Sequence, residues 1–309
     1  MRHSQRLIQG ATALLRKCSC WPAILAIVVG FPVTAARGQY ASSGTSTSGV
    51  GGELASDFKY LANNLEADGE DIVTAPLHLD AAGALFTNPR FYWIVAGAGA
   101  AFGGSFALDY TMRMNLKNMG SSAANSLQTA SYSSVIAATS LLYGYGLYSG
   151  DARAREYALT AGEGAAVAVL LNLGIKAAFG RLRPFEGNHD HNAFFPGGQS
   201  FVSGDVAPMF ALATGVSEYF DNRWEVAIPA YSLALLDGFG RMGNDAHWFS
   251  DVVGAALLGI GTTELFLYLH RQHENQPWRF RIFPYSPPPS ANGSRRSVVP
   301  TGLTISLSW

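Results

Sequence analysis

The sequence predicts an all-α protein, a bundle of about six helices followed by an irregular C-terminal tail. Between residues 91 and 270 there is no strict alternation of apolar and polar residues, which a half-buried strand would show. Apolar blocks such as Ala165–Ile175 and Val252–Leu269 are instead typical of buried helices. The same region is rich in glycine and alanine, whose small size allows helices to pack closely.

The composition excludes two classes of protein. Charged residues make up 14% of the 309 residues, against roughly 25% in an average soluble domain, so intrinsic disorder is excluded. A net charge of -1 excludes a protein that binds nucleic acid through bulk positive charge. The length suffices for one large core or for two small domains.

Residues 1–38 are a predicted export signal. They contain five lysines and arginines, no acidic residue, an apolar run at Trp21–Val29, and small residues before Gln39, where we expect cleavage. Cleavage would remove Cys18 and Cys20 and leave a chain without thiols in the periplasm or cell envelope. Because the segment is longer than an ordinary signal, a retained membrane anchor is the alternative.

The rest of the chain divides into three parts. Residues 39–90 are a Ser/Thr/Gly-rich linker followed by short helices, residues 91–272 are the bundle, and residues 273–309 are a proline-rich tail. Alternation at Gly302–Trp309 allows one edge strand, but an ordered terminus without a strand fits equally well. The six helices are expected near residues 91–108, 125–149, 153–180, 204–220, 224–236 and 248–271.

Association with a membrane stays open. Residues 91–108 and 118–150 carry no charge over a length that could cross a bilayer, but both are rich in Gly, Ser and Ala. Acidic residues such as Glu163 and Asp237 interrupt other helices, and charges within a bilayer are costly. We therefore favour a compact bundle over a membrane-embedded one.

Three clusters of residues carry chemistry, and the first is cationic. Lys176 and Arg183 are seven residues apart, so both side chains leave the same face of a helix that Pro184 ends. Cations at a helix end suit a multiply charged anion, because Arg offers a planar fork and Lys a point charge to phosphate oxygens. A basic cap on the helix C-terminus is the alternative.

The second cluster is Ser203-Gly204-Asp205. It precedes an apolar run with Pro208 in its first turn, which marks the start of a helix. Free backbone N–H groups at such a start bind oxyanions, and Gly204 permits close approach of the backbone. An ordinary Ser or Asp N-cap is the alternative.

The third cluster contains Arg241, His247 and Asp251. His247 and Asp251 are four residues apart and hence neighbours on one helix face. A carboxylate bonded to one imidazole nitrogen leaves the lone pair of the other nitrogen free, so the histidine can act as a nucleophile or base. A surface His–Asp pair is the alternative.

In order and spacing, these clusters resemble the motifs of the type 2 phosphatidic acid phosphatase and vanadium haloperoxidase superfamily, which also contains bacterial class A acid phosphatases. The shared motifs are Lys-x6-Arg-Pro, Ser-Gly and Arg-x5-His-x3-Asp, and the resemblance covers about residues 153–270. It implies a helical bundle of that family's kind. It also implies hydrolysis of a lipid phosphate, or of another phosphomonoester or diphosphate, without a metal or other cofactor.

The resemblance further implies a role for each motif residue. His247 would attack phosphorus to give a phosphohistidine, and Asp251 would orient its ring. A group that we call the phosphate cradle would hold the phosphate oxygens and stabilise their charge. Its members are Lys176, Arg183, Ser203, Gly204 and Arg241.

One departure from the family pattern concerns proton supply. Where the family has Pro-Ser-Gly-His, this chain has Asp205 in place of the histidine that protonates the leaving oxygen, and Gly240 replaces a family serine. An Asp donates a proton only if its pKa rises well above about 3.9, whereas nearby cations lower it. We therefore expect a slow phosphatase that tolerates good leaving groups.

The loop between the first two clusters offers other candidates. His189 or His191 could supply the missing proton, although a His-containing loop of this kind is usually solvated. The aromatic residues Phe194, Phe195 and Phe201 either line a leaving-group pocket or pack in the core.

Two other functions remain as alternatives. A degenerate relative would keep the cradle and bind an anion or lipid in the cell envelope without turnover. A vanadium-dependent haloperoxidase would hold vanadate, which mimics phosphate, in the same cradle. The family's haloperoxidases are usually longer and use the histidine that is Asp205 here.

Overall fold

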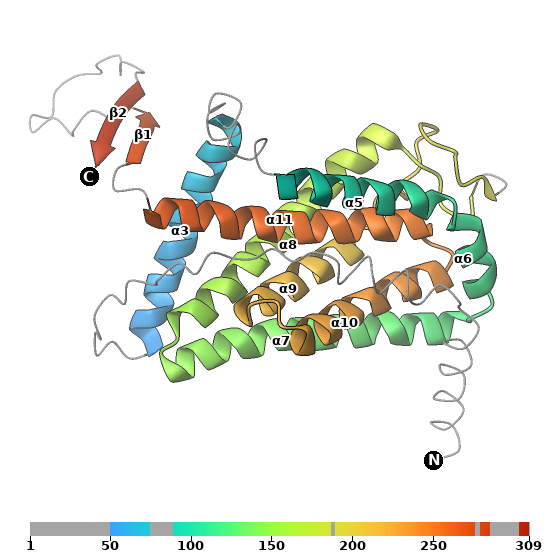
Figure 1. Ribbon diagram of the computed structural model, residues 1–309, viewed down its shortest axis with the longest axis horizontal. Helices are drawn as coiled ribbons and strands as arrows, with labels where there is room; N and C mark the ends of the chain where they lie inside the picture. Colours follow the sequence, from blue (N-terminus) through green and yellow to red (C-terminus); the bar gives the residue numbers. More distant parts are fainter. Residues whose placement is uncertain (1–49, 75–88, 187–188, 276–278, 285–302, 309) are drawn as a thin grey trace, which may run out of the picture. The chain divides into compact units, whose positions relative to one another are not determined.

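The computed structural model describes residues 50–74, 89–186, 189–275, 279–284 and 303–308. Within these ranges the chain forms eight helices and two strands (Figure 1). The helices are α3 (Val50–Thr74), α5 (Pro89–Phe106), α6 (Asp109–Leu116), α7 (Ser121–Ser149), α8 (Ala152–Phe179), α9 (Val206–Tyr219), α10 (Trp224–Gly243) and α11 (Phe249–Asn275). The predicted signal, residues 1–38, lies outside the described residues.

The prediction of an all-α fold is confirmed, but the expected number of helices was too low. Six of the eight helices correspond to the six predicted ones. The seventh, α3, is a single long helix in a region where short ones were expected. The eighth, α6, has only eight residues and lies between the two uncharged stretches, where no helix was expected.

The C-terminal tail is not irregular throughout. Strands β1 (Arg279–Pro284) and β2 (Leu303–Ser308) pair antiparallel, from Arg279 opposite Ser308 to Pro284 opposite Leu303. The alternation at the C-terminus therefore marks a strand, and its partner was missed because prolines follow it directly. The chain divides into two compact units, residues 1–267 and 268–309, and the strands belong to the second.

The helices of the first unit pack closely on one another. Helix α10 packs mainly on α7 and α9, and α8 packs on α9 and α7. Helix α11 approaches α9 so closely that a Cβ atom on Gly259 would collide with the backbone carbonyl of Ala207. The buried core between these helices includes Met112, Val206, Phe210, Met242 and Val252.

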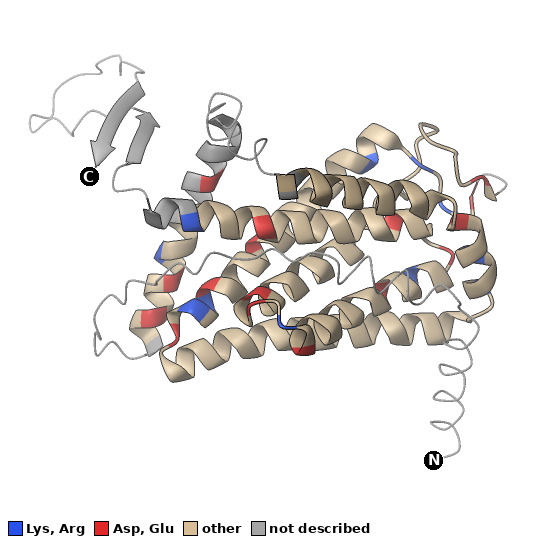
Figure 2. Cartoon of the chain, in the orientation of Figure 1, with Lys and Arg blue, Asp and Glu red and all other residues tan. Residues whose placement is uncertain are grey.

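Two described helices are long and apolar enough to cross a membrane, judged by length and composition alone. They are α8 and residues Phe249–Arg271 of α11. Neither helix corresponds to residues 91–108 or 118–150, the two stretches that stood out in the sequence because they lack charge. Helix α7, one of those stretches, carries no charged residue, as Figure 2 shows, but it is rich in serine and is not one of the two candidate spans.

Candidate active site

The end of α8 places Lys176. Gly180 adopts the left-handed conformation with φ 50°, and its N–H donates to the carbonyl of Lys176 at 2.9 Å. The helix therefore ends before Pro184, and Arg183 lies beyond it, so the prediction that Lys176 and Arg183 share a helix face was wrong. The two charges still act on each other: burial first, and then the charge of Arg183, lower the pKa of Lys176.

Helix α8 also fixes the turn that contains Ser203 and Gly204. Asn172, one helical turn before Lys176, donates from Nδ2 to the carbonyl of Val202 at 2.7 Å. A Cβ atom on Gly204 would lie 3.0 Å from Asn172 Oδ1 and 3.8 Å from Lys176 Nζ, so this turn sits against the lysine amine. Ser203 is fully buried, and its hydroxyl has no hydrogen-bond partner among the described residues.

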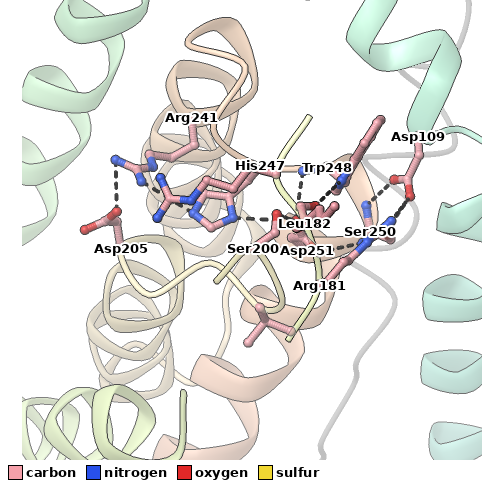
Figure 3. A network of polar contacts seen from close by, with 12 residues as sticks. Asp109, Arg181, Leu182, Ser200, Asp205, Arg241, His247, Trp248, Ser250 and Asp251 are labelled. Carbon is pink, nitrogen blue, oxygen red and sulfur yellow. Dashed lines mark hydrogen bonds and ion pairs between the residues drawn. The ribbon is translucent and has the colours of Figure 1, made fainter. Parts of the chain in front are cut away.

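Asp205 stands at the N-cap position of α9 without capping it. Its side chain accepts no hydrogen bond from the helix N-terminus. Instead Asp205 Oδ2 lies 3.1 Å from Arg241 Nη1, in the last turn of α10 (Figure 3). The N-cap alternative is therefore wrong for this side chain, which belongs to an ion pair.

His247 lies between α10 and α11, and its imidazole is completely buried. Helix α11 begins at Phe249, so the expectation that His247 and Asp251 share a helix face was wrong, because His247 precedes the helix. The two side chains nevertheless meet, with His247 Nδ1 3.5 Å from Asp251 Oδ2. On the other side of the ring, Nε2 is 3.4 Å from Arg241 Nη2.

The burial of both side chains excludes the surface-pair alternative and sets their charges. Burial lowers the pKa of His247, which favours a neutral ring with a free lone pair. Burial alone would raise the pKa of Asp251, but nearby His247 and Arg181 outweigh it and lower that pKa. Asp251 is therefore ionised while His247 is neutral.

Several hydrogen-bond donors hold Asp251 in place. Its Oδ1 accepts from Arg181 Nη1 at 2.6 Å, and its Oδ2 accepts from the backbone N–H of Trp248 at 2.9 Å and from the hydroxyl of Ser200. Figure 3 shows this network on the side of the imidazole away from Asp205. The carboxylate that orients His247 thus has a fixed position.

Arg181 is the central residue that sequence reasoning missed. It is completely buried, donates from Nη2 to Asp109 Oδ2 at 2.6 Å, and donates from Nη1 to Asp251 as well. Its guanidinium lies 4.9 Å from the ring of Phe194 and 5.5 Å from that of Trp248. Because two carboxylates neutralise it, Arg181 supports the site and is not a free anion-binding cation.

Helix α6, also missed, anchors the turn that carries His247. Asp109 accepts from the backbone N–H of Ser250 at 2.7 Å. One turn later, Arg113 donates to both carboxylate oxygens of Asp245 at 2.6 Å. A signal was available, because Asp109 follows a long uncharged stretch, and an acid in such surroundings needs a partner.

The two loop histidines considered for proton supply contact groups outside the phosphate cradle. His189 is exposed, with Nδ1 2.6 Å from the carbonyl of Pro184, and the His191 ring packs edge-on against Trp248. Phe201 and Phe194 join the core, as the packing alternative predicted. Phe195 is 74% exposed.

Comparison with known proteins finds similarity over part of this chain. The family model of the PAP2 superfamily matches residues 157–275. A lipid A 1-phosphatase of Porphyromonas gingivalis is 37% identical over 98 residues, which are 31% of this chain and 20% of that protein. The chain therefore matches about a fifth of the length of that curated relative. No solved structure matches the chain.

Proposed function

We propose, because residues 157–275 match the family model of the PAP2 superfamily, that the protein hydrolyses a phosphate ester, without a metal, through a phosphohistidine at His247. The observation that carries this proposal is the buried His247–Asp251 pair beside Arg241. Asp251 faces Nδ1, so Nε2 is the nitrogen on the side of the cationic group, where it attacks phosphorus.

Two groups of the phosphate cradle lack partners within the described part of the chain. Among the described residues, the buried Nε of Arg241 and the hydroxyl of Ser203 have no hydrogen-bond partner. Buried polar groups are normally satisfied, so both are suited to oxygens of a bound anion. Lys176, beside Gly204, and Arg183 supply further positive charge, which stabilises the equatorial oxygens during phosphoryl transfer.

The substrate we propose is a lipid phosphate. The name of the similar Porphyromonas gingivalis protein supports it, and so do two helices apolar enough to associate with a membrane. We further propose that the predicted signal delivers the enzyme to the periplasm or cell envelope.

A substrate screen tests this function. The full-length chain, purified in mild detergent, is assayed for phosphate release from p-nitrophenyl phosphate, octyl phosphate, a sugar 1-phosphate and phosphatidic acid, with His247→Ala as control. We expect release that the control lacks. Binding of inorganic phosphate without any turnover would instead favour the degenerate anion-binding alternative.

The ion pair between Asp205 and Arg241 leads to a prediction about leaving groups. An aspartate that is held in an ion pair is a weaker proton donor than a histidine, so Asp205→His strengthens the donor. We expect Asp205→His to raise octyl phosphate hydrolysis by about tenfold or more relative to p-nitrophenyl phosphate. Asp205→Asn, which removes the charge but adds no acid, is the matched control. Equal rates for Asp205→His and the wild type on octyl phosphate would contradict the prediction.

A further inference from the structure

A buried carboxyl group beside the site has no part in the mechanism described so far. Asp237 lies on α10, one helical turn before Arg241, so the two side chains share a face of the helix. Asp237 has no exposed surface, and neither of its carboxylate oxygens makes a hydrogen bond of good geometry within the described part of the chain, although the Tyr132 hydroxyl lies nearby. Because an ionised carboxylate without partners is very costly to bury, this side chain is expected to carry a proton.

Arg241 connects this buried acid to the reacting groups. Its Nη1 lies 3.1 Å from Asp205 Oδ2, and its Nη2 lies 3.4 Å from His247 Nε2. The Asp205 side chain is 42% exposed, whereas Asp237 is completely buried. Asp205 is therefore accessible to an incoming ester, and Asp237 is protected from solvent.

On the basis of the proposed function, we infer that Asp237 stores the proton needed by the leaving group and that Asp205 delivers it. When phosphate oxygens bind Arg241, Asp205 loses its ion pair and lies next to a second negative charge. A proton transferred from Asp237 then relieves the repulsion between Asp205 and the phosphate. Asp237, once ionised, is one turn from Arg241 and can replace Asp205 as the partner of the guanidinium.

The charges around Asp237 agree with this role. Three titratable or charged groups of the described residues act on it: Asp205 at the start of α9, Tyr132 on α7 and Arg241 on its own helix. Burial, followed by the charge of Asp205, raises the pKa of Asp237 to about 7, and Arg241 and the nearby Tyr132 hydroxyl lower it by less. Asp237 is therefore protonated below about pH 7 and loses its proton as the pH rises through that value.

The proton transfers balance over the two chemical steps. In the first, the bond from His247 Nε2 to phosphorus forms and the bond from phosphorus to the alcohol oxygen breaks. That oxygen takes a proton from Asp205, which Asp237 replaces. In the second, water attacks phosphorus, the nitrogen–phosphorus bond breaks, and a proton from water returns through Asp205 to Asp237.

The test compares two substrates across a pH series. Full-length wild type and Asp237→Asn are assayed on octyl phosphate, which has a poor leaving group, and on p-nitrophenyl phosphate, which has a good one. We expect Asp237→Asn to lower kcat for octyl phosphate by about 10²-fold, but kcat for p-nitrophenyl phosphate by only about tenfold. The wild-type loss of octyl phosphate activity above about pH 7 should disappear in the variant. Adding Asp205→His to the Asp237→Asn variant should restore its activity on octyl phosphate, because a histidine at position 205 carries its own proton.

Two controls separate this inference from other causes. Asp221→Asn changes an exposed acid that pairs with Arg153, and it should leave kcat unchanged for both substrates. Infrared titration should show a carboxylic acid band that disappears near pH 7 in the wild type and is absent in Asp237→Asn, whether or not the enzyme turns over. Equal losses on both substrates, or an unchanged infrared band, would overturn the inference. A wild type inactive on both substrates would refute the proposed function itself, and this inference with it.

Discussion

Replacing Asp251 with Asn is expected to reduce phosphate release by on the order of 10⁴-fold, the effect that loss of a buried aspartate behind a catalytic histidine can have. Asp251 is the group that faces His247 Nδ1, and it is completely buried there. An amide cannot hold the Nδ1 proton or stabilise a charged ring as a carboxylate does. The initial rate on p-nitrophenyl phosphate, measured beside thermal unfolding, provides the readout.

The same carboxylate also helps to neutralise Arg181, so loss of activity must be distinguished from loss of structure. Circular dichroism should show that Asp251→Asn keeps its helices at the assay temperature. Asp221→Asn is the matched control and should retain full activity, because its side chain is 68% exposed. An Asp251→Asn protein that is folded and within tenfold of wild-type activity would contradict the assigned role.

Replacing Arg181 with Leu is expected to destabilise the fold by about 3–5 kcal/mol, the usual cost of removing one partner of a buried ion pair. Arg181 lies between Asp109 and Asp251, both fully buried, at 2.6 Å from each. Its loss leaves two carboxylates without their cation, and both must then take up protons or water. The midpoint of thermal unfolding measures the effect.

A matched substitution on the surface distinguishes this effect from a general loss of positive charge. Arg153 pairs with exposed Asp221 at 2.8 Å, and pairs of this kind contribute about 0–1 kcal/mol. Arg153→Leu should therefore change the unfolding midpoint far less than Arg181→Leu. Equal shifts for the two variants would show that the buried network does not stabilise the protein.

Helices could be predicted from the sequence because their apolar blocks are long and their ends carry local signals. Helix α8 illustrates this: Asp151 caps its start by accepting from the N–H of Ala154 at 3.2 Å, and Gly180 ends it. The order of the motif residues could also be read from the sequence. Through the family resemblance, their order and spacing along the chain led us to expect Lys176, Arg241 and His247 in one site.

The supporting residues could not be predicted because their partners are far away in the sequence. Arg181 meets an acid 72 residues away in Asp109 and another 70 residues away in Asp251. Nothing local distinguished it from Arg183, two positions later in the same basic motif. Asp237 looked like an interruption of an apolar helix, and only its burial beside the Asp205–Arg241 pair marks it as part of the site.

The central claim is that His247 becomes covalently phosphorylated, and rapid trapping of that intermediate tests it most directly. Full-length enzyme is mixed with ³²P-labelled p-nitrophenyl phosphate, denatured in alkali to preserve an acid-labile nitrogen–phosphorus bond, and mapped by mass spectrometry. We predict one labelled peptide that contains His247, with the label absent from His247→Ala. Phosphate release that persists in His247→Ala, or a label on any other residue, would contradict the account.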